Sequence, residues 1–181
     1  MKKNLWIFII LIVTIVCLES LGRIWWAESG TTIPWCFEVA SENNSQTLLD
    51  PYTFSHILHG VIFFWAFAWA FPKCSAESKY VAALGLEAAW EILENTPFII
   101  NRYREITVSL GYYGDSIANS MSDIAACMLG YVVAQKLGLK WSIAVFVLIE
   151  VIMLWLIRDC LTLNVIMLVH PFEFLQEWQK G

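Results

Sequence analysis

Long apolar stretches separated by short polar segments dominate the pattern of residues along this chain. A helix needs about 20 apolar residues to cross the ~30 Å hydrocarbon core of a bilayer. Stretches of about that length with few charges run over residues 5–26, 52–71, 80–99, 116–135 and 141–157. The pattern therefore predicts an all-α fold, a polytopic transmembrane helical bundle of about five spanning helices, in a single integral membrane domain over residues 1–181.

A sixth apolar stretch, residues 161–169, is too short to span a bilayer and ends at His170 and Pro171. We expect an interfacial or re-entrant segment there. The connections 27–51 and 100–115 and the C-terminal segment 158–181 are then predicted on one side of the membrane. The first stretch follows Lys2 and Lys3, as a signal peptide would, but no small-residue cleavage site follows it, so we expect it to be retained.

Composition agrees with the apolar pattern and excludes some classes of function. The chain is 59% hydrophobic and 15% charged, and its mean hydropathy is +0.61, which is unusual for a water-soluble domain. Its net charge is −5 and its lysines and arginines are scattered, so we expect no binding to nucleic acid. Cys36 and Cys160 fall outside the predicted spans, and either a disulfide or two free thiols would fit there.

Lysine and arginine are distributed differently over the predicted loops. With a cytoplasmic N-terminus, the inner segments carry six lysines and the outer side carries the five remaining basic residues, including every arginine. The positive-inside rule slightly favours this orientation. Arginine also suits bidentate binding of a carboxylate or phosphate. We therefore predict a bacterial inner-membrane protein with its N-terminus in the cytoplasm, its C-terminus in the periplasm and its working face outside.

Ionisable side chains recur inside the predicted spans, where a charge costs about 2.5–3.5 kcal/mol on insertion scales. Carboxylates at i, i+4 and i+7 share a face of the third stretch, namely Glu87, Glu91 and Glu94. A second polar face lies on the fourth stretch, namely Asp115, Asn119, Ser122 and Asp123. His56 and His59 lie one turn apart on the second stretch. Because lipid cannot satisfy these groups, we expect them to meet inside the bundle, in the outer half of the membrane.

This polar layer leads to a first hypothesis, an enzyme or binding protein for an outer-leaflet lipid or lipid-linked substrate. The catalytic candidates are Glu91, Glu94, Asp115 and Asp123. The substrate-binding candidates are Arg102, Arg104, Arg158, Asp159 and Asn119. A divalent metal is the candidate cofactor, with His56 and His59 as its ligands, although two histidines one turn apart are equally common as a packing pair.

Two other hypotheses fit the same residues. In a structural or accessory membrane protein, the polar layer would serve only to fix the packing of the helices. In a proton-coupled or cation-coupled binding or transport module, the surplus of acids would carry the ion. The chain has no evident internal repeat of the kind common in transporters, and the sequence leaves open whether it forms oligomers.

Several short motifs resemble those of a known family. They are Ser41-Glu42-Asn43, Tyr52-Thr53, Ser55-His56-x-x-His59-Gly60, Trp90-Glu91, Glu94-Asn95-Thr96-Pro97-Phe98, Arg102-Tyr103-Arg104, Tyr112-Tyr113-Gly114-Asp115-Ser116, Arg158-Asp159 and Thr162-Leu163-Asn164-Val165-Ile166-Met167. Together they are similar to an uncharacterised, UPF-type family of bacterial multi-pass inner-membrane proteins, a domain of unknown function. The resemblance implies a location and a topology, but no activity. A Glu-bearing helix followed by Gly-Asp-x3-Asn-x3-Asp also distantly resembles VanZ-like membrane proteins, with different spacing.

Overall fold

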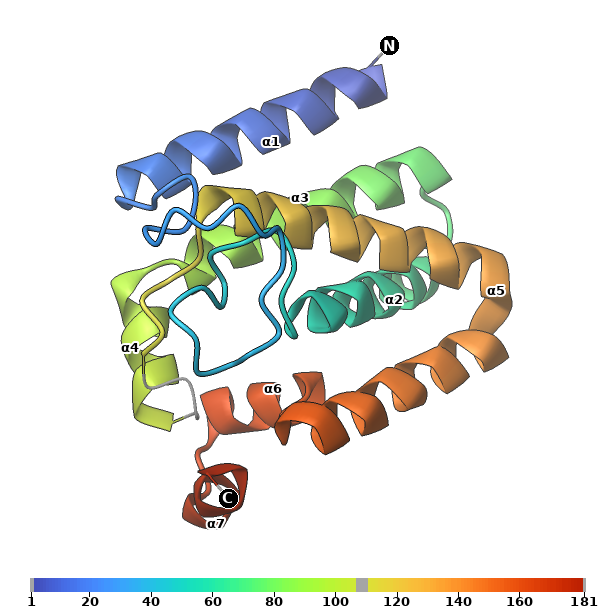
Figure 1. Cartoon of the computed structure of the whole chain (residues 1–181). Coiled ribbons are helices and arrows are strands. Elements are labelled where there is room, and N and C mark those ends of the chain that lie inside the picture. Colours follow the sequence, from blue (N-terminus) through green and yellow to red (C-terminus); the bar gives the residue numbers. More distant parts are fainter. Residues whose placement is uncertain (1, 107–110, 181) are drawn as a thin grey trace.

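A computed structural model describes residues 2–106 and 111–180 of the chain, and this part is helical without a β-sheet (Figure 1). Its helices, in chain order, are α1 (Lys2–Ser20), α2 (Thr53–Ala70), α3 (Ala76–Glu94), α4 (Pro97–Ile106), α5 (Ile117–Ile157), α6 (Leu161–Val169) and α7 (Glu173–Lys180). A single isolated β-bridge, between Trp35 and Leu49, lies in the long connection between α1 and α2. The predicted all-α fold is confirmed.

Three of the described helices, α1, α2 and α5, are long and apolar enough to cross a membrane by length and composition. The helix α3 has a similar length but carries several carboxylates. The 41 residues of α5 would extend about 60 Å as one straight helix, twice the thickness of a hydrocarbon core. Gly138 has a non-helical conformation, with φ 74° and ψ 170°, and α5 doubles back there (Figure 1).

The helix boundaries differ from the predicted ones in several places. The first helix ends at Ser20 and not near Trp26, because the chain turns at Gly22, whose φ of 76° no regular helix has. The predicted loop 100–115 overlaps α4, and the C-terminal segment contains α7 in addition to the expected short helix α6. Two predicted spans, 116–135 and 141–157, form the two halves of α5.

Two glycines let α2 and α5 pack in close contact. A Cβ atom on Gly60 would overlap the carbonyl oxygen of Cys127, and a Cβ atom on Gly130 would overlap that of Ile57. Small residues allow this kind of backbone approach between apolar helices. The same contact brings the start of α2, with His56, close to the first half of α5, with Asp123.

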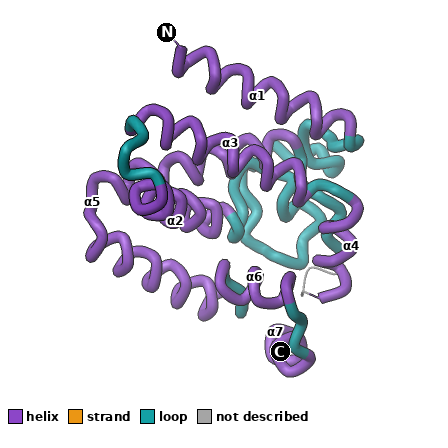
Figure 2. The backbone as a smooth tube through the Cα atoms, turned by 180° about the vertical axis from the view of Figure 1, so that it is seen from behind, coloured by secondary structure: helices purple, strands orange, loops and turns teal. Residues whose placement is uncertain are grey.

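The long connections gather at one end of the bundle, together with α4 and α6 (Figures 1 and 2). The connection 21–52 closes the start of α5, because carbonyls of Ile24, Trp25 and Ser45 accept hydrogen bonds from the first backbone amides of that helix or of its cap, Ser116. Asn119 donates to the carbonyl of Thr47 at 2.8 Å. This end of the bundle is therefore a buried polar structure that holds the starts of α2 and α5.

Candidate functional site

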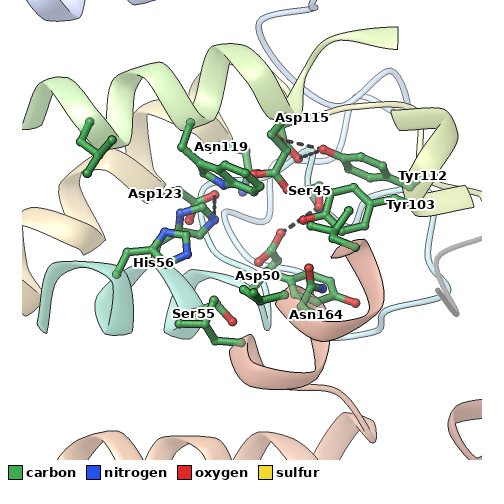
Figure 3. A pocket seen from close by; sticks show the side chains of 18 of the residues that line it. Ser45, Asp50, Ser55, His56, Tyr103, Tyr112, Asp115, Asn119, Asp123 and Asn164 are labelled. Atoms are coloured by element: carbon green, nitrogen blue, oxygen red, sulfur yellow. Dashed lines mark hydrogen bonds and ion pairs between the residues drawn. The ribbon is translucent and has the colours of Figure 1, made fainter. Parts of the chain in front are cut away.

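A cavity of about 290 Å³ lies at this end of the bundle (Figure 3). Its lining comes from α2, α3, α4, α5, α6 and the connections between them. Its polar lining comprises Ser45, Asp50, Tyr52, Ser55, His56, His59, Trp90, Glu94, Tyr103, Tyr112, Asp115, Asn119, Asp123 and Asn164. Its apolar lining comprises Phe63, Leu86, Leu161, Val165 and Leu168. No lysine or arginine is among these described lining residues.

Glu87 is completely buried and accepts hydrogen bonds from both histidines of α2. The His56 Nδ1 atom lies 2.6 Å from Glu87 Oε1, and the His59 Nδ1 atom lies 3.1 Å from Glu87 Oε2. A carboxylate that receives one ring nitrogen of a histidine fixes the orientation of the ring. The second nitrogen of His56, Nε2, then points toward Asp123, whose Oδ2 atom is 3.9 Å away (Figure 3).

Three further carboxylates surround His56 without a full set of hydrogen bonds. Glu91 is completely buried, and in the described structure neither of its oxygens has a hydrogen-bond partner, although Oε1 lies 3.3 Å from His56 Nδ1. Glu94 Oε2 and Asp123 Oδ1 are buried in the same way. Buried polar atoms nearly always have a partner. These acceptors therefore identify a place where a proton or a cation is needed.

Asp115, in contrast, is well supplied with hydrogen bonds just before α5. Its Oδ2 atom accepts from Asn95 Nδ2 at 2.9 Å, its backbone amide donates to Asn95 Oδ1 at 2.7 Å, and the Tyr112 hydroxyl lies 3.1 Å from both carboxylate oxygens. Burial, helped by the nearby charge of Asp50, raises the pKa of Asp115 to about 6 in spite of the hydrogen bonds from Asn95 and Tyr112. The Asp115 carboxyl therefore holds a proton more readily than an ordinary aspartate does.

Asp50 lines the cavity just before the start of α2. Its carboxylate accepts hydrogen bonds from the backbone amides of Ser45 and Thr53, and the Thr53 hydroxyl accepts one from the amide of Asp50 in return. This reciprocal arrangement caps the first turn of α2. Burial raises the pKa of the Asp50 carboxyl above its usual value.

The short helix α6 covers one side of the cavity and is attached by its two ends. The Glu150 carboxylate of α5 accepts hydrogen bonds from the backbone amides of Leu161 and Thr162. Its negative charge offsets the partial positive charge at the N-terminus of α6. Asp159 contacts the Tyr52 hydroxyl at 3.4 Å. At the other end, Arg102 donates to the carbonyl of Leu168 at 3.2 and 3.3 Å. These contacts hold the apolar lining of α6 against the polar lining of α2 and α5.

The structure brings together most of the site residues predicted from the sequence. The cavity wall contains His56, His59, Glu94, Asp115, Asn119 and Asp123, and Glu91 lies beside His56. The arginines and Asp159 lie elsewhere. Arg102 binds α6, Arg158 donates to the carbonyl of Trp178, and Arg104 is exposed on α4. Cys36 and Cys160 are free thiols.

Some residues of the site were absent from the sequence prediction. Asp50, Tyr52, Tyr103 and Tyr112 line the cavity, and Asn95 holds Asp115. The position of Asp50, just before the second apolar segment, indicates a helix cap, because an acidic residue there often caps the helix that follows. The tyrosines carried no signal of their own, since Tyr and Trp are common at both ends of spanning helices.

Fold and site together define a helical protein in which long apolar helices enclose a histidine–carboxylate centre next to a partly apolar cavity. The chain belongs to the family described as Protein of unknown function (DUF2585), whose model matches residues 18–181. Its relatives include a UPF0314 protein of Brucella anthropi, 49% identical over 88% of this chain and 81% of the relative. Another, from Sphingopyxis alaskensis, is 44% identical over 91% of this chain and 87% of the relative.

A UPF0314 protein of Agrobacterium fabrum is also 44% identical, over 95% of this chain and 87% of the relative. These matches confirm the resemblance to an uncharacterised bacterial family, and they do not show a link to VanZ-like proteins. No solved structure matches the chain.

Proposed function

We propose that this is a multi-pass protein of the bacterial inner membrane that takes up an amphiphilic lipid or lipid-linked molecule from the outer leaflet and acts on its polar head. The proposal has five crossings, made by α1, α2, α3 and the two halves of α5. Its bacterial relatives and its three strongly apolar helices support a membrane location. The length of α5, with its reversal at Gly138, supports two crossings by that helix.

The single observation that carries the proposal is the two-sided lining of the cavity. Leu86 on α3 and Val165 on α6 both line it and keep 46% and 51% of their surface exposed. In a membrane this surface would face lipid, so an acyl chain can reach the cavity from the bilayer. The same lining includes His56 and Asp123. A ligand that fits has an apolar tail and a polar head.

The polar end supports acid–base chemistry on that head. His56 has one nitrogen on Glu87 and the other directed toward the cavity side, where Asp123, Asn119 and Glu94 also lie. A histidine oriented in this way by a carboxylate is a common general acid or base. The reaction class proposed is therefore hydrolysis or transfer at the head of the amphiphile.

Occupation of the cavity by a lipid tests the proposal. The protein would be purified in mild detergent and examined by native mass spectrometry, and the bound molecule would be extracted and identified. We expect about one retained amphiphile per chain. Leu86→Trp should displace it, because the larger side chain takes up space in the apolar lining of the cavity.

Leu93→Trp provides a matched control, because Leu93 lies on the same helix, is also 46% exposed and is not among the lining residues. It should keep the bound molecule. Equal retention by both variants, or a wild-type protein without a bound amphiphile, would contradict the proposal.

A purely structural role is the second candidate, because several acids of the polar layer are already paired. Asp115 is bound by Asn95 and Tyr112, and Glu150 by the start of α6. For this role, His56→Gln should change stability and cellular phenotype together. A folded His56→Gln protein without the wild-type phenotype would exclude it.

A further inference from the structure

We propose that His56, Glu91, Glu94 and Asp123 bind a divalent first-row transition-metal ion in the wall of the cavity. The inference deepens the proposed function, because it names the ligand of the polar end, and the part of the ion in turnover rests on that function. Metal binding itself is argued from geometry alone and is measured without a substrate.

The first argument is the arrangement of donor atoms around His56. One ligand atom each from His56, Glu91 and Glu94 can be chosen so that all of them lie within 4.8 Å of one another. Asp123 adds Oδ2 at 3.9 Å from His56 Nε2. Ligands of a single ion at metal distances of about 2.0–2.2 Å stand roughly 3–4 Å apart. The set comes from α2, α3 and α5, so the packing of three helices fixes it.

The second argument is that several oxygens of these carboxylates lack a hydrogen bond. Both oxygens of Glu91, Oε2 of Glu94 and Oδ1 of Asp123 are buried and lack hydrogen bonds in the described structure. All of them are acceptors, so the missing partner is a donor or a cation. Asn119 Oδ1 is a further buried acceptor of this kind in the cavity wall, since its Nδ2 atom already donates to Thr47.

A neighbouring group of residues shows what a completed cluster looks like. His56, His59 and Glu87 also have donor atoms within 4.8 Å of one another, but their own hydrogen bonds join them. Glu87 therefore fits as the carboxylate that holds Nδ1, with Glu91 Oε1 3.3 Å from the same nitrogen and Nε2 facing Asp123. Metal-binding histidines almost always have such a partner on the second nitrogen.

The third argument is electrostatic. Glu87, Glu91 and Asp123 are each at most 3% exposed, and Glu94 lies beside them, yet no lysine or arginine is among the described residues of the cavity lining. Buried charges need a counter-charge or a metal. A divalent ion neutralises two carboxylates at once and uses their convergent oxygens. An imidazole ligand favours Zn²⁺ or Fe²⁺ over Ca²⁺ and Mg²⁺, and the three carboxylates also suit Mn²⁺.

The ion also accounts for how an anionic head group would be bound here. Of the arginines expected to hold such a group, Arg102 and Arg158 bind carbonyls of α6 and α7, and Arg104 is exposed. A divalent ion at His56 would supply positive charge and Lewis acidity at the polar end of the cavity. Asn119 and Tyr52, which also line the cavity, would then orient the head group.

The test is the metal content and metal affinity of the full-length protein. Purified protein would be analysed by elemental mass spectrometry, stripped with a chelator and titrated with Zn²⁺ and, separately, Mn²⁺ by calorimetry. We expect one ion per chain. Glu91→Gln and Asp123→Asn should each weaken binding by more than about tenfold, because each loses a ligand oxygen.

Glu150→Gln is the matched control, since Glu150 is a buried carboxylate that binds backbone amides away from the cluster. It should bind the ion like the wild type. In the Mn²⁺ protein, electron spin echo spectroscopy should detect a nitrogen of His56 that His56→Gln removes. Thermal unfolding in detergent would establish that each variant is folded, and Glu94→Gln, at a less buried position, replaces any variant that is not.

Saturable binding that is unchanged in folded Glu91→Gln and Asp123→Asn would overturn the metal site, as would a folded wild type that binds neither ion. The outcome is separate from that of the lipid experiment. Loss of the amphiphile in Leu86→Trp with no metal binding would retain the proposed function and reject only the ion.

Discussion

Glu87 illustrates how an acidic residue can be kept inside an apolar helix. Its two oxygens accept from His56 and His59, which lie one turn apart on α2, and no part of its side chain reaches solvent. The three residues thus form a closed group. Glu91, one turn further along α3, lies 3.3 Å from His56 Nδ1 but its oxygens accept no hydrogen bond in the described structure. The same residue type therefore supports His56 at one position and offers free oxygens at the next.

Glu87→Gln should lower metal affinity by about 10–100-fold while one ion still binds per chain, since Glu87 orients His56 and is not a ligand. Calorimetry with Zn²⁺ measures this. A merely structural Glu87 would change the unfolding temperature without changing the affinity. The Glu150→Gln protein again serves as control, and an unaltered affinity in folded Glu87→Gln would reject the positioning role.

The buried carboxyl of Asp159 should make the free energy of unfolding depend on pH. Burial raises its pKa from 3.8 to about 6, against the hydrogen bonds from the Cys160 amide, Asn164 and Tyr52. The raised pKa means that the folded protein binds a proton more tightly than the unfolded chain. The stability from this proton is complete below about pH 4 and is lost as the pH rises through about 6.

Asp159→Asn should therefore become more stable relative to the wild type as the pH rises from about 4 to 7, by up to about 3 kcal/mol. Denaturant unfolding in detergent, followed by tryptophan fluorescence, checks the difference at each pH. Glu42→Gln, at an exposed carboxylate, should run parallel to the wild type. A constant difference between Asp159→Asn and wild type would show that Asp159 does not titrate in this range.

At the scale of helices, the contact between α2 and α5 positions the candidate site. The backbones touch at Gly60 and Gly130, so the two helices approach more closely than larger residues would permit. His56 lies one turn before Gly60, and Asp123 lies two turns before Gly130. The separation of the helices therefore sets the distance between His56 and Asp123.

Gly60→Ala should lower the unfolding temperature strongly and weaken metal binding, because its methyl group would overlap the Cys127 carbonyl and push the helices apart. Gly85→Ala is the matched control within a helix. A Cβ atom there meets only Ile10 Cδ1 at 3.8 Å, so helix propensity should leave it neutral or stabilised by up to about 1 kcal/mol. Equal unfolding temperatures for the two variants would contradict the proposed close contact.

At the scale of the whole molecule, apolar periodicity predicted the elements better than their ends. The second apolar stretch, expected over residues 52–71, is α2, Thr53–Ala70. The two halves of α5 correspond to the separate apolar stretches expected over residues 116–135 and 141–157. The helix α7 escaped detection because it is short and amphipathic, and its residues include charges typical of a loop.

The candidate site could be predicted in its helical part only. His56, Glu91 and Asp123 were found because an acid or histidine in an apolar helix stands out. Asp50, Tyr52 and Asn95 were not, because their positions depend on how the connection 21–52 folds over the starts of α2 and α5. The arginines were expected around the cavity because all of them fall on the predicted outer side of the membrane. In the structure, the side chains of Arg102 and Arg158 instead donate hydrogen bonds to the carbonyls of Leu168 and Trp178.

The proposed orientation in the membrane is tested by two native cysteines at opposite ends of the bundle. Cys36 lies in the long connection between α1 and α2, and exposed Cys74 lies in the short connection between α2 and α3. In single-cysteine proteins, an impermeant maleimide added to intact spheroplasts should label Cys36. It should label Cys74 only after the membrane is opened, because Lys73 and Lys79 favour a cytoplasmic position for that connection. Labelling of Cys74 alone in intact spheroplasts would invert the orientation and place the cavity, with α4 and α6, on the cytoplasmic side.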